Sequence, residues 1–151
     1  MLIQIGISAL GCPYLYKLSF LLSGERKVAF ATLLLYSLCP YLIAKSVESQ
    51  PIPLFMTLLI ASTYHYFKAM DLKHALCCGI AFGLTILTRA MILPAFILGL
   101  LVLVVHRRFL SATIILSSAF IITLPYFARN WQLDRSILPT RSGVESFSWE
   151  L

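Results

Sequence analysis

Six apolar runs, separated by short polar segments, fill most of this 151-residue chain. The longest reach the roughly 20 apolar residues that a helix needs to cross a bilayer. The pattern predicts an all-α polytopic membrane protein with about six transmembrane helices. A transmembrane region at residues 1–128 would precede an external segment at residues 129–151. The runs cover residues 2–22, 28–44, 51–67, 75–88, 90–105 and 109–128.

Arg89 alone separates the fourth run from the fifth. One helix through both runs would be too long for a bilayer and would carry an arginine near its middle. Two helices of about 21–24 Å each would instead form a hairpin that turns at Arg89. Pro94 favours a break nearby, because proline lacks the N–H of a helical hydrogen bond. For the same reason, Pro40 predicts a kink near the end of the second run.

Composition excludes a soluble domain, a disordered chain and a coiled coil. Hydrophobic residues make up 60% and charged residues 12%, and the mean hydropathy is +0.89. Soluble domains hold roughly 45–50% apolar and 25% charged residues. The four cysteines lie inside apolar runs without a C-x-x-C spacing. We expect them to pack within the helical region and to form neither a disulfide nor a metal site.

The net charge of +6 comes from cations that sit in ones and twos between the runs. A nucleic-acid surface would need a dense basic stripe with interleaved aromatic residues, so nucleic acid is excluded as a partner. Two of the short connections on one side hold only Lys45 and Arg89. The three alternate connections hold Lys17, Arg26, Lys27, Lys68, Lys73, Arg107 and Arg108. The positive-inside rule then predicts a multi-pass protein of the plasma membrane, in bacteria the inner membrane, with both termini outside.

Two motifs within the runs have structural interpretations. Gly79 and Gly83 form a G-x-x-x-G pattern, which predicts close contact between helices. His65 lies within the aromatic segment 64–67, which predicts an aromatic belt at the inner interface rather than a ligand.

Two segments near the predicted outer face combine a cation with groups that suit a phosphate. Arg89 ends the fourth run, and a guanidinium binds phosphate through paired hydrogen bonds. Arg129 and Asn130 follow Pro125 and two interfacial aromatic residues. Together a guanidinium and an amide can hold a phosphate or the hydroxyls of a headgroup. For both segments the alternative is an arginine that only anchors its helix at the interface, and the residues leave both open.

Three stretches, in order, carry a family pattern. Gly79–Ala90 is a glycine-rich helix ending in Leu-Thr-Arg-Ala, Leu124–Asn130 reads Leu-Pro-Tyr-Phe-Ala-Arg-Asn, and Leu138–Gly143 reads Leu-Pro-Thr-Arg-Ser-Gly. Together they resemble the polyprenyl-phosphate-sugar-dependent glycosyltransferases of the GT-C class. The resemblance is strongest to family 39, which includes protein O-mannosyltransferases and the aminoarabinose transferases of lipid A. Ala90 stands where that family has proline, and Tyr126 where it has tryptophan.

The resemblance implies a partial GT-C-like transmembrane bundle with its active site at the outer face. Such an enzyme moves a sugar from a polyprenyl-phosphate carrier in the membrane lipid to an acceptor, by an inverting displacement. The acceptor stays open between a protein, lipid A and another glycan. Arg89, Arg129 and Asn130 would contact the phosphate of the carrier.

The resemblance also implies an acidic residue in a first external loop, as a base or as the partner of a divalent metal. That loop would lie upstream of Met1, so we expect a chain shortened at its N-terminus and inactive alone. The family carries Asp or Glu just before the third helix, where this chain has Gln50. Glu48 is the nearest carboxylate and the catalytic candidate, since inversion at a sugar carbon needs a base.

A non-catalytic membrane protein, either half of a transporter or an assembly partner, is the alternative. Transporters usually show internal repeats or paired broken helices around a midplane site. This chain shows no evident repeat and, apart from Lys17, little charge inside its runs.

Overall fold

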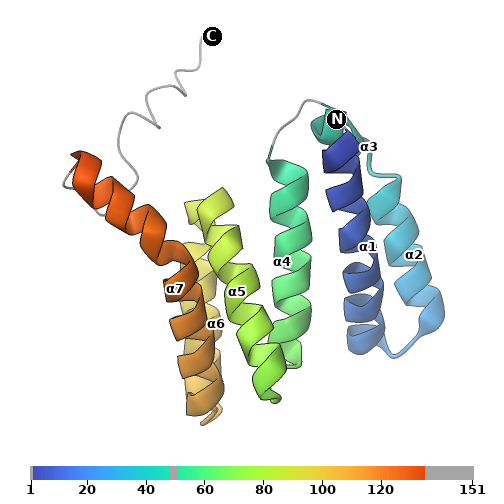
Figure 1. Ribbon diagram of the computed structural model, residues 1–151. Coiled ribbons are helices and arrows are strands. Elements are labelled where there is room, and N and C mark those ends of the chain that lie inside the picture. The colour runs from blue at the N-terminus through green and yellow to red at the C-terminus, as the bar shows by residue number, and fades with distance from the viewer. Residues whose placement is uncertain (1, 48–50, 135–151) are drawn as a thin grey trace.

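The computed structural model describes residues 2–47 and 51–134, which are almost entirely helical and include no strand (Figure 1). The prediction of an all-α fold is therefore confirmed. The helices are α1 (Leu2–Ser23), α2 (Arg26–Ser37), α3 (Pro40–Val47), α4 (Ile52–Phe67), α5 (Leu72–Thr88), the 3-10 turn η1 (Ala90–Ile92), α6 (Leu93–Val105) and α7 (Phe109–Asp134).

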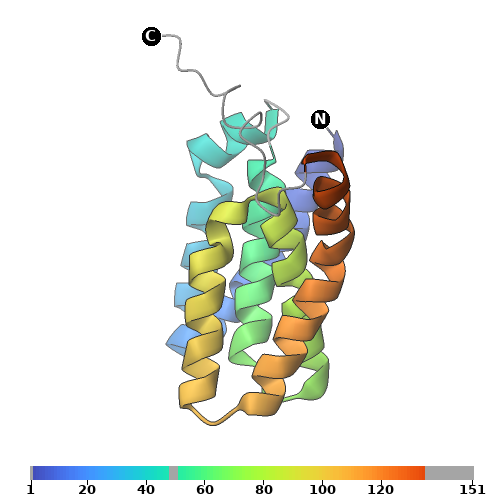
Figure 2. The same ribbon diagram turned by 90° about the vertical axis from the view of Figure 1, so that its left-hand side faces the viewer.

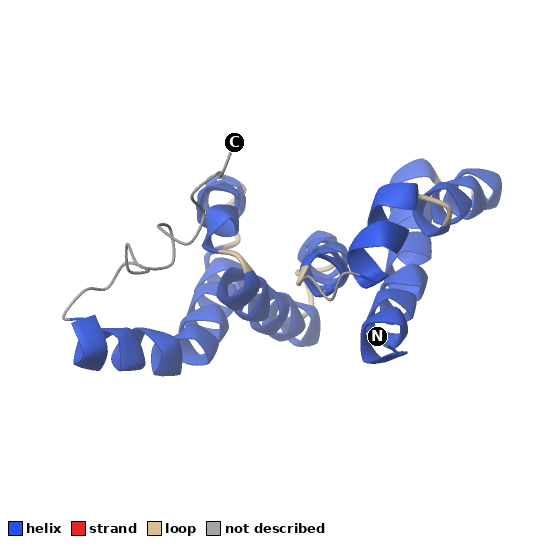
Figure 3. Cartoon of the chain, turned by 90° about the horizontal axis from the view of Figure 1, so that it is seen from above, coloured by secondary structure: helices blue, strands red, loops and turns tan. Residues whose placement is uncertain are grey.

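The long helices run alternately up and down, and they stand in an open, folded layer rather than a closed bundle (Figures 1 and 3). Helix α1 packs between α2 and α4. Helix α4 also packs against α5, and α5 packs on α7. Helix α6 lies alongside α7 and joins it through the turn at residues 106–108 (Figure 2). The turns after α1, α4 and α6 share one end of the layer, which we call the basic end. The turn between α5 and α6 lies at the opposite end, which we call the Arg89 end (Figure 1).

Two local features differ from the predicted helices. The second apolar run is broken rather than kinked, because α2 ends with the Leu38 N–H bonded to the Leu34 carbonyl, and Pro40 begins α3. The last helix extends to Asp134, beyond the predicted end at residue 128, and so includes Arg129 and Asn130. It carries Pro125 in its interior, and its final turns tilt away from α5 (Figure 1). A proline without an N–H to donate accounts for a bend of this kind.

The hairpin at Arg89 is confirmed. Helix α5 ends at Thr88, the Arg89 backbone is extended with φ −153° and ψ 110°, and α6 runs back after η1. The rings of Phe82 and Phe96 lie 5.1 Å apart between the two arms. The Tyr66 hydroxyl of α4 donates a hydrogen bond of 2.8 Å to the Gly99 carbonyl of α6. These contacts hold the returning helix against its neighbours.

Helices α5 and α7 meet at the G-x-x-x-G pattern, as the sequence predicts. Gly79 and Gly83 are buried, and a Cβ added at Gly79 would overlap the Ser118 Oγ and lie 2.6 Å from the Ile115 carbonyl oxygen. A Cβ at Gly83 would lie 2.9 Å from the Cβ of Ile122. The two backbones approach this closely because neither glycine has a side chain. The main apolar cluster forms here and contains Ala69, Ala75, Cys78, Phe96, Leu103, Ala112, Ile115 and Ala119.

The cysteines only partly follow the packing prediction. Cys78 is buried in the main cluster, but its neighbour Cys77 is exposed on the outer face of α5, because successive helical residues point about 100° apart. Cys12 and Cys39 are half-buried. None of the four forms a disulfide among the residues that the structure describes.

Replacing Gly79 by valine should lower the free energy of unfolding by about 1–3 kcal/mol, because the added methyl groups overpack the α5–α7 contact. Gly6→Val is the matched control: Gly6 lies in α1, and a Cβ there would meet nothing within 4 Å. Denaturant unfolding in detergent solution, followed by circular dichroism, measures both changes. Equal losses in the two variants would contradict the close packing of α5 on α7.

Candidate functional site

Arg89 follows the last residue of α5 and is exposed. Its N–H donates to the Thr85 carbonyl at 2.9 Å, which fixes the backbone at the helix end. Its guanidinium carbon lies 5.9 Å from the centroid of the Phe55 ring on α4, within the range of a cation–π contact. Neither Glu25 nor Asp71, the two carboxylates whose side chains the structure describes, forms an ion pair with Arg89. The guanidinium is therefore oriented by an aromatic face while its N–H donors stay available.

Arg129 and Asn130 lie on the tilted last turns of α7, where Arg129 is exposed and Asn130 half-buried. They share the Arg89 end of the layer, but within the described ranges no hydrogen bond joins either residue to Arg89. Since successive helical residues point about 100° apart, their side chains leave α7 on adjacent faces. The structure thus brings the three predicted contact residues to one end of the molecule, on α7 and at the end of α5 (Figure 1).

A narrow apolar crevice connects the helices that carry these residues. It has a volume of about 140 Å³ and lies between α5, α6 and α7. Ile86 and Leu93, on either side of the Arg89 turn, line it together with Phe127, two residues before Arg129. Hydropathy along the sequence does not reveal this crevice, because it requires three helices to meet.

The catalytic candidate Glu48 lies outside the described residues. In the part of the chain that the structure describes, no three His, Cys, Asp or Glu side chains come together as metal ligands. Among the side chains that the structure describes, this end of the layer carries the two cations Arg89 and Arg129.

A second cluster, at the basic end, was missed by the sequence analysis. His65 and His74 place their Nδ1 atoms 2.9 Å apart, so one ring donates and the other accepts a hydrogen bond. The Tyr64 ring is buried and lies 5.3 Å from the His65 ring, centroid to centroid. Tyr64 thus departs from the predicted aromatic belt, because it is buried between helices, whereas His65 is half-buried. Only Phe67 of the segment is largely exposed.

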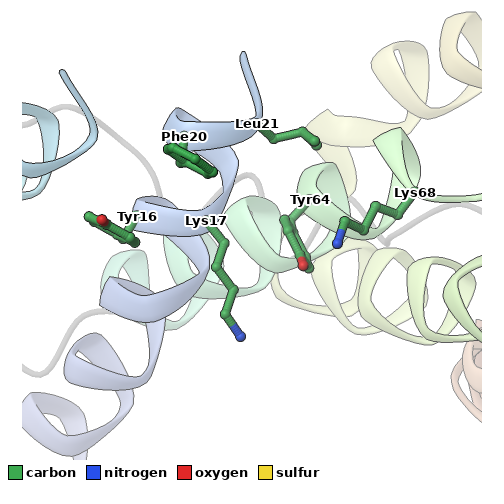
Figure 4. A pocket seen from close by; sticks show the side chains of 6 residues that line it. All are labelled: Tyr16, Lys17, Phe20, Leu21, Tyr64 and Lys68. Carbon is green, nitrogen blue, oxygen red and sulfur yellow. The ribbon is translucent and has the colours of Figure 1, made fainter. Parts of the chain in front are cut away.

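A pocket of about 360 Å³ opens beside this cluster between α1 and α4 (Figure 4). Lys17 and Lys68 stand on its two sides, and the Lys68 Nζ lies 5.2 Å from the centroid of the Tyr64 ring. The one feature of the sequence that points to this pocket is Lys17, a single cation inside an otherwise apolar run. Its partner Lys68 is distant in sequence, and only the pairing of α1 with α4 brings the two together.

Comparisons with protein-family models, with curated proteins and with solved structures find no match to this chain. The resemblance to GT-C glycosyltransferases, and the roles it implies, remain predictions.

Replacing Ala90 by proline, the residue found there in the resembled family, should keep or raise the free energy of unfolding by up to about 1 kcal/mol. The extended Arg89 backbone is the conformation favoured before a proline, and residue 90 begins a helical turn, where no N–H is needed. Leu84→Pro, inside α5, should instead cost about 3 kcal/mol or more. Thermal and denaturant unfolding in detergent distinguish the two, and a comparable loss at both positions would refute this description of the Arg89 turn.

Proposed function

We propose that this chain is a polytopic helical membrane protein that binds the phosphate of a polyprenyl-phosphate-linked sugar at its Arg89 end, as the carrier-binding part of a glycosyltransferase. The observation that carries the proposal is the exposed Arg89 guanidinium. Its guanidinium carbon lies 5.9 Å from the centroid of the Phe55 ring, and Ile86 and Leu93, on either side of the Arg89 turn, line an apolar crevice.

Membrane placement is supported by the outer surface of the helices. Helix α7 is long and apolar enough to cross a membrane, and α4, α5 and α6 are shorter apolar helices, among the residues that the structure describes. Large apolar side chains are exposed on the outward faces, such as Leu35 (75%), Leu98 (63%) and Val105 (76%). A water-soluble monomer rarely exposes patches of this extent. We assign six helices, α1, α2, α4, α5, α6 and α7, to membrane crossings. The shorter ones among them would cross where the bilayer thins locally or where terminal side chains snorkel to the interface.

The hydrogen bonds of the serine and threonine hydroxyls also support membrane placement. Those on exposed helix faces donate to carbonyls of their own helix: Thr32 to Val28 at 2.9 Å, Ser37 to Leu33 at 2.6 Å and Thr113 to Phe109 at 2.9 Å. Hydrocarbon offers no hydrogen-bond partners, so a hydroxyl that faces lipid must be satisfied within its helix.

Carrier binding is supported by the chemistry of the Arg89 end. A polyprenyl phosphate joins an anion to a hydrocarbon chain, and this end joins a guanidinium to an apolar crevice lined by Ile86 and Phe127. Arg129 and Asn130 sit at the same end, on the helix that forms one wall of the crevice. A bound carrier would therefore lie with its phosphate toward Arg89 and its first isoprenyl groups between α5, α6 and α7.

Topology gives a direct test. In a chain whose native cysteines are replaced by alanine, a cysteine at Met91, exposed in the Arg89 turn, should react with a membrane-impermeant maleimide added to intact bacterial cells. A cysteine at Lys27, exposed in the first turn of α2 at the basic end, should react only after the cells are opened. The opposite labelling would invert the orientation, and labelling of both in intact cells would contradict a membrane-spanning layer.

Binding gives the test of function. Arg89→Gln should weaken binding of a polyprenyl phosphate to the purified chain roughly ten- to hundredfold, because a charge-assisted contact to phosphate is worth roughly 1.5–3 kcal/mol. Arg129→Gln should weaken it in the same direction. Titration in detergent with native mass spectrometry gives the dissociation constants.

Arg26→Gln is the control, since Arg26 is an exposed arginine at the basic end. It should leave the dissociation constant unchanged. Identical affinity in Arg89→Gln, Arg26→Gln and the parent chain would leave Arg89 as a helix anchor and favour the non-catalytic alternative.

A further inference from the structure

The pocket between α1 and α4 joins two ammonium groups to apolar and aromatic walls. Lys17 comes from α1 and Lys68 follows the last residue of α4, and the Lys68 side chain reaches toward the Tyr64 ring (Figure 4). Phe20 and Leu21, each more than 40% exposed, continue the lining along α1. Cations beside an open apolar wall suit an amphiphile with a negatively charged head.

Lys17 lies inside α1, away from the end of the helix, where a positive charge is costly without an anionic partner. It lies six residues before the end of α1, about 9 Å along the axis at 1.5 Å per residue, so it sits at membrane depth if α1 crosses a bilayer. A charged group at that depth is costly unless it is paired or reaches the interface. Neither Glu25 nor Asp71, the carboxylates with described side chains, forms an ion pair with Lys17 or Lys68.

Asp71 lies in the same turn as Lys68, where its N–H donates to the Lys68 carbonyl at 3.3 Å, but it is not part of the pocket lining. His65, beside the pocket, is hydrogen-bonded to His74 at 2.9 Å. The remaining polar lining consists of the hydroxyls of Tyr16 and Tyr64, which can donate to an anion. The pocket therefore attracts anions and disfavours metal cations, although two imidazoles lie beside it.

We propose that this pocket binds the phosphate headgroup of an anionic phospholipid, with the two lysines on the phosphate and an acyl chain along Phe20 and Leu21. The site is separate from the carrier site: it lies at the basic end and is built by α1 and α4. A lipid is favoured over free phosphate because the pocket opens onto apolar side chains and because the basic end would face the anionic inner leaflet. The inference rests on the proposed membrane placement but not on carrier binding at Arg89.

The test uses the purified full chain in detergent, titrated with phosphatidylglycerol and read by native mass spectrometry. Lys17→Gln and Lys68→Gln should each raise the dissociation constant about fivefold, and the double variant more, since a lysine near an anionic headgroup contributes about that factor. The double variant with arginine at both positions should keep binding. Lys73→Gln, an exposed lysine of α5 outside the pocket, should behave as the parent chain. Circular dichroism checks that every variant keeps its helical content.

Three outcomes would overturn the site. They are equal affinity for phosphatidylglycerol and phosphatidylcholine, equal losses in Lys73→Gln and in the pocket variants, and failure of the double arginine variant to bind. Displacement of the lipid by millimolar inorganic phosphate would assign the pocket to free phosphate and overturn the lipid assignment.

The two proposals fail separately. Arg89→Gln should leave phosphatidylglycerol binding unchanged, and the lysine variants should leave polyprenyl-phosphate binding unchanged. Loss of both ligands in either variant would contradict the independence of the two sites.

Discussion

The contact of α5 with α7 through Gly79 and Gly83 is the interaction on which the second half of the molecule depends. Because the two backbones nearly touch, α7 is held along much of its length, and its first turn is tied to the α4–α5 turn by the Ser111 hydroxyl, which donates to the Ala69 carbonyl at 2.7 Å. Helix α6 then packs on α7, and the crevice beside Arg89 exists only because these three helices meet. A larger residue at either glycine would separate the walls of the crevice as well as the helices.

A second constraint acts on the polar groups. The helices satisfy their backbone internally, their exposed hydroxyls donate within the same helix, and most cations collect at the ends. Because the cations collect at the helix ends, the outward faces are apolar. A cation away from a helix end therefore marks a candidate binding site. Lys17 is such a cation, and the structure places beside it another lysine, a buried tyrosine and a pocket.

The two proposed sites share a design although different helices build them. Each combines a cation with an aromatic ring, Arg89 over Phe55 at one end and Lys68 over Tyr64 at the other. Each opens onto apolar side chains, which suits an amphiphile with a phosphate head better than a freely soluble anion. An aromatic face holds a long cationic side chain in place and leaves its outer hydrogen-bond donors to a ligand.

Local pattern was enough to predict most of the helices, the hairpin at Arg89 and a small-residue face at Gly79 and Gly83, because each depends on residues near one another in the chain. Only the tertiary structure shows that α7 is the helix that packs on this face. Hydropathy could not predict the continuation of α7 to Asp134, since polar residues end an apolar run without ending a helix. It also misjudged Tyr64, whose burial depends on α1 and α5 packing beside α4. The pairing of Lys17 with Lys68 was decided by the order in which the helices stand. That order depends on how the side-chain surfaces of helices distant in sequence fit together, and residue spacing along the chain does not predict it.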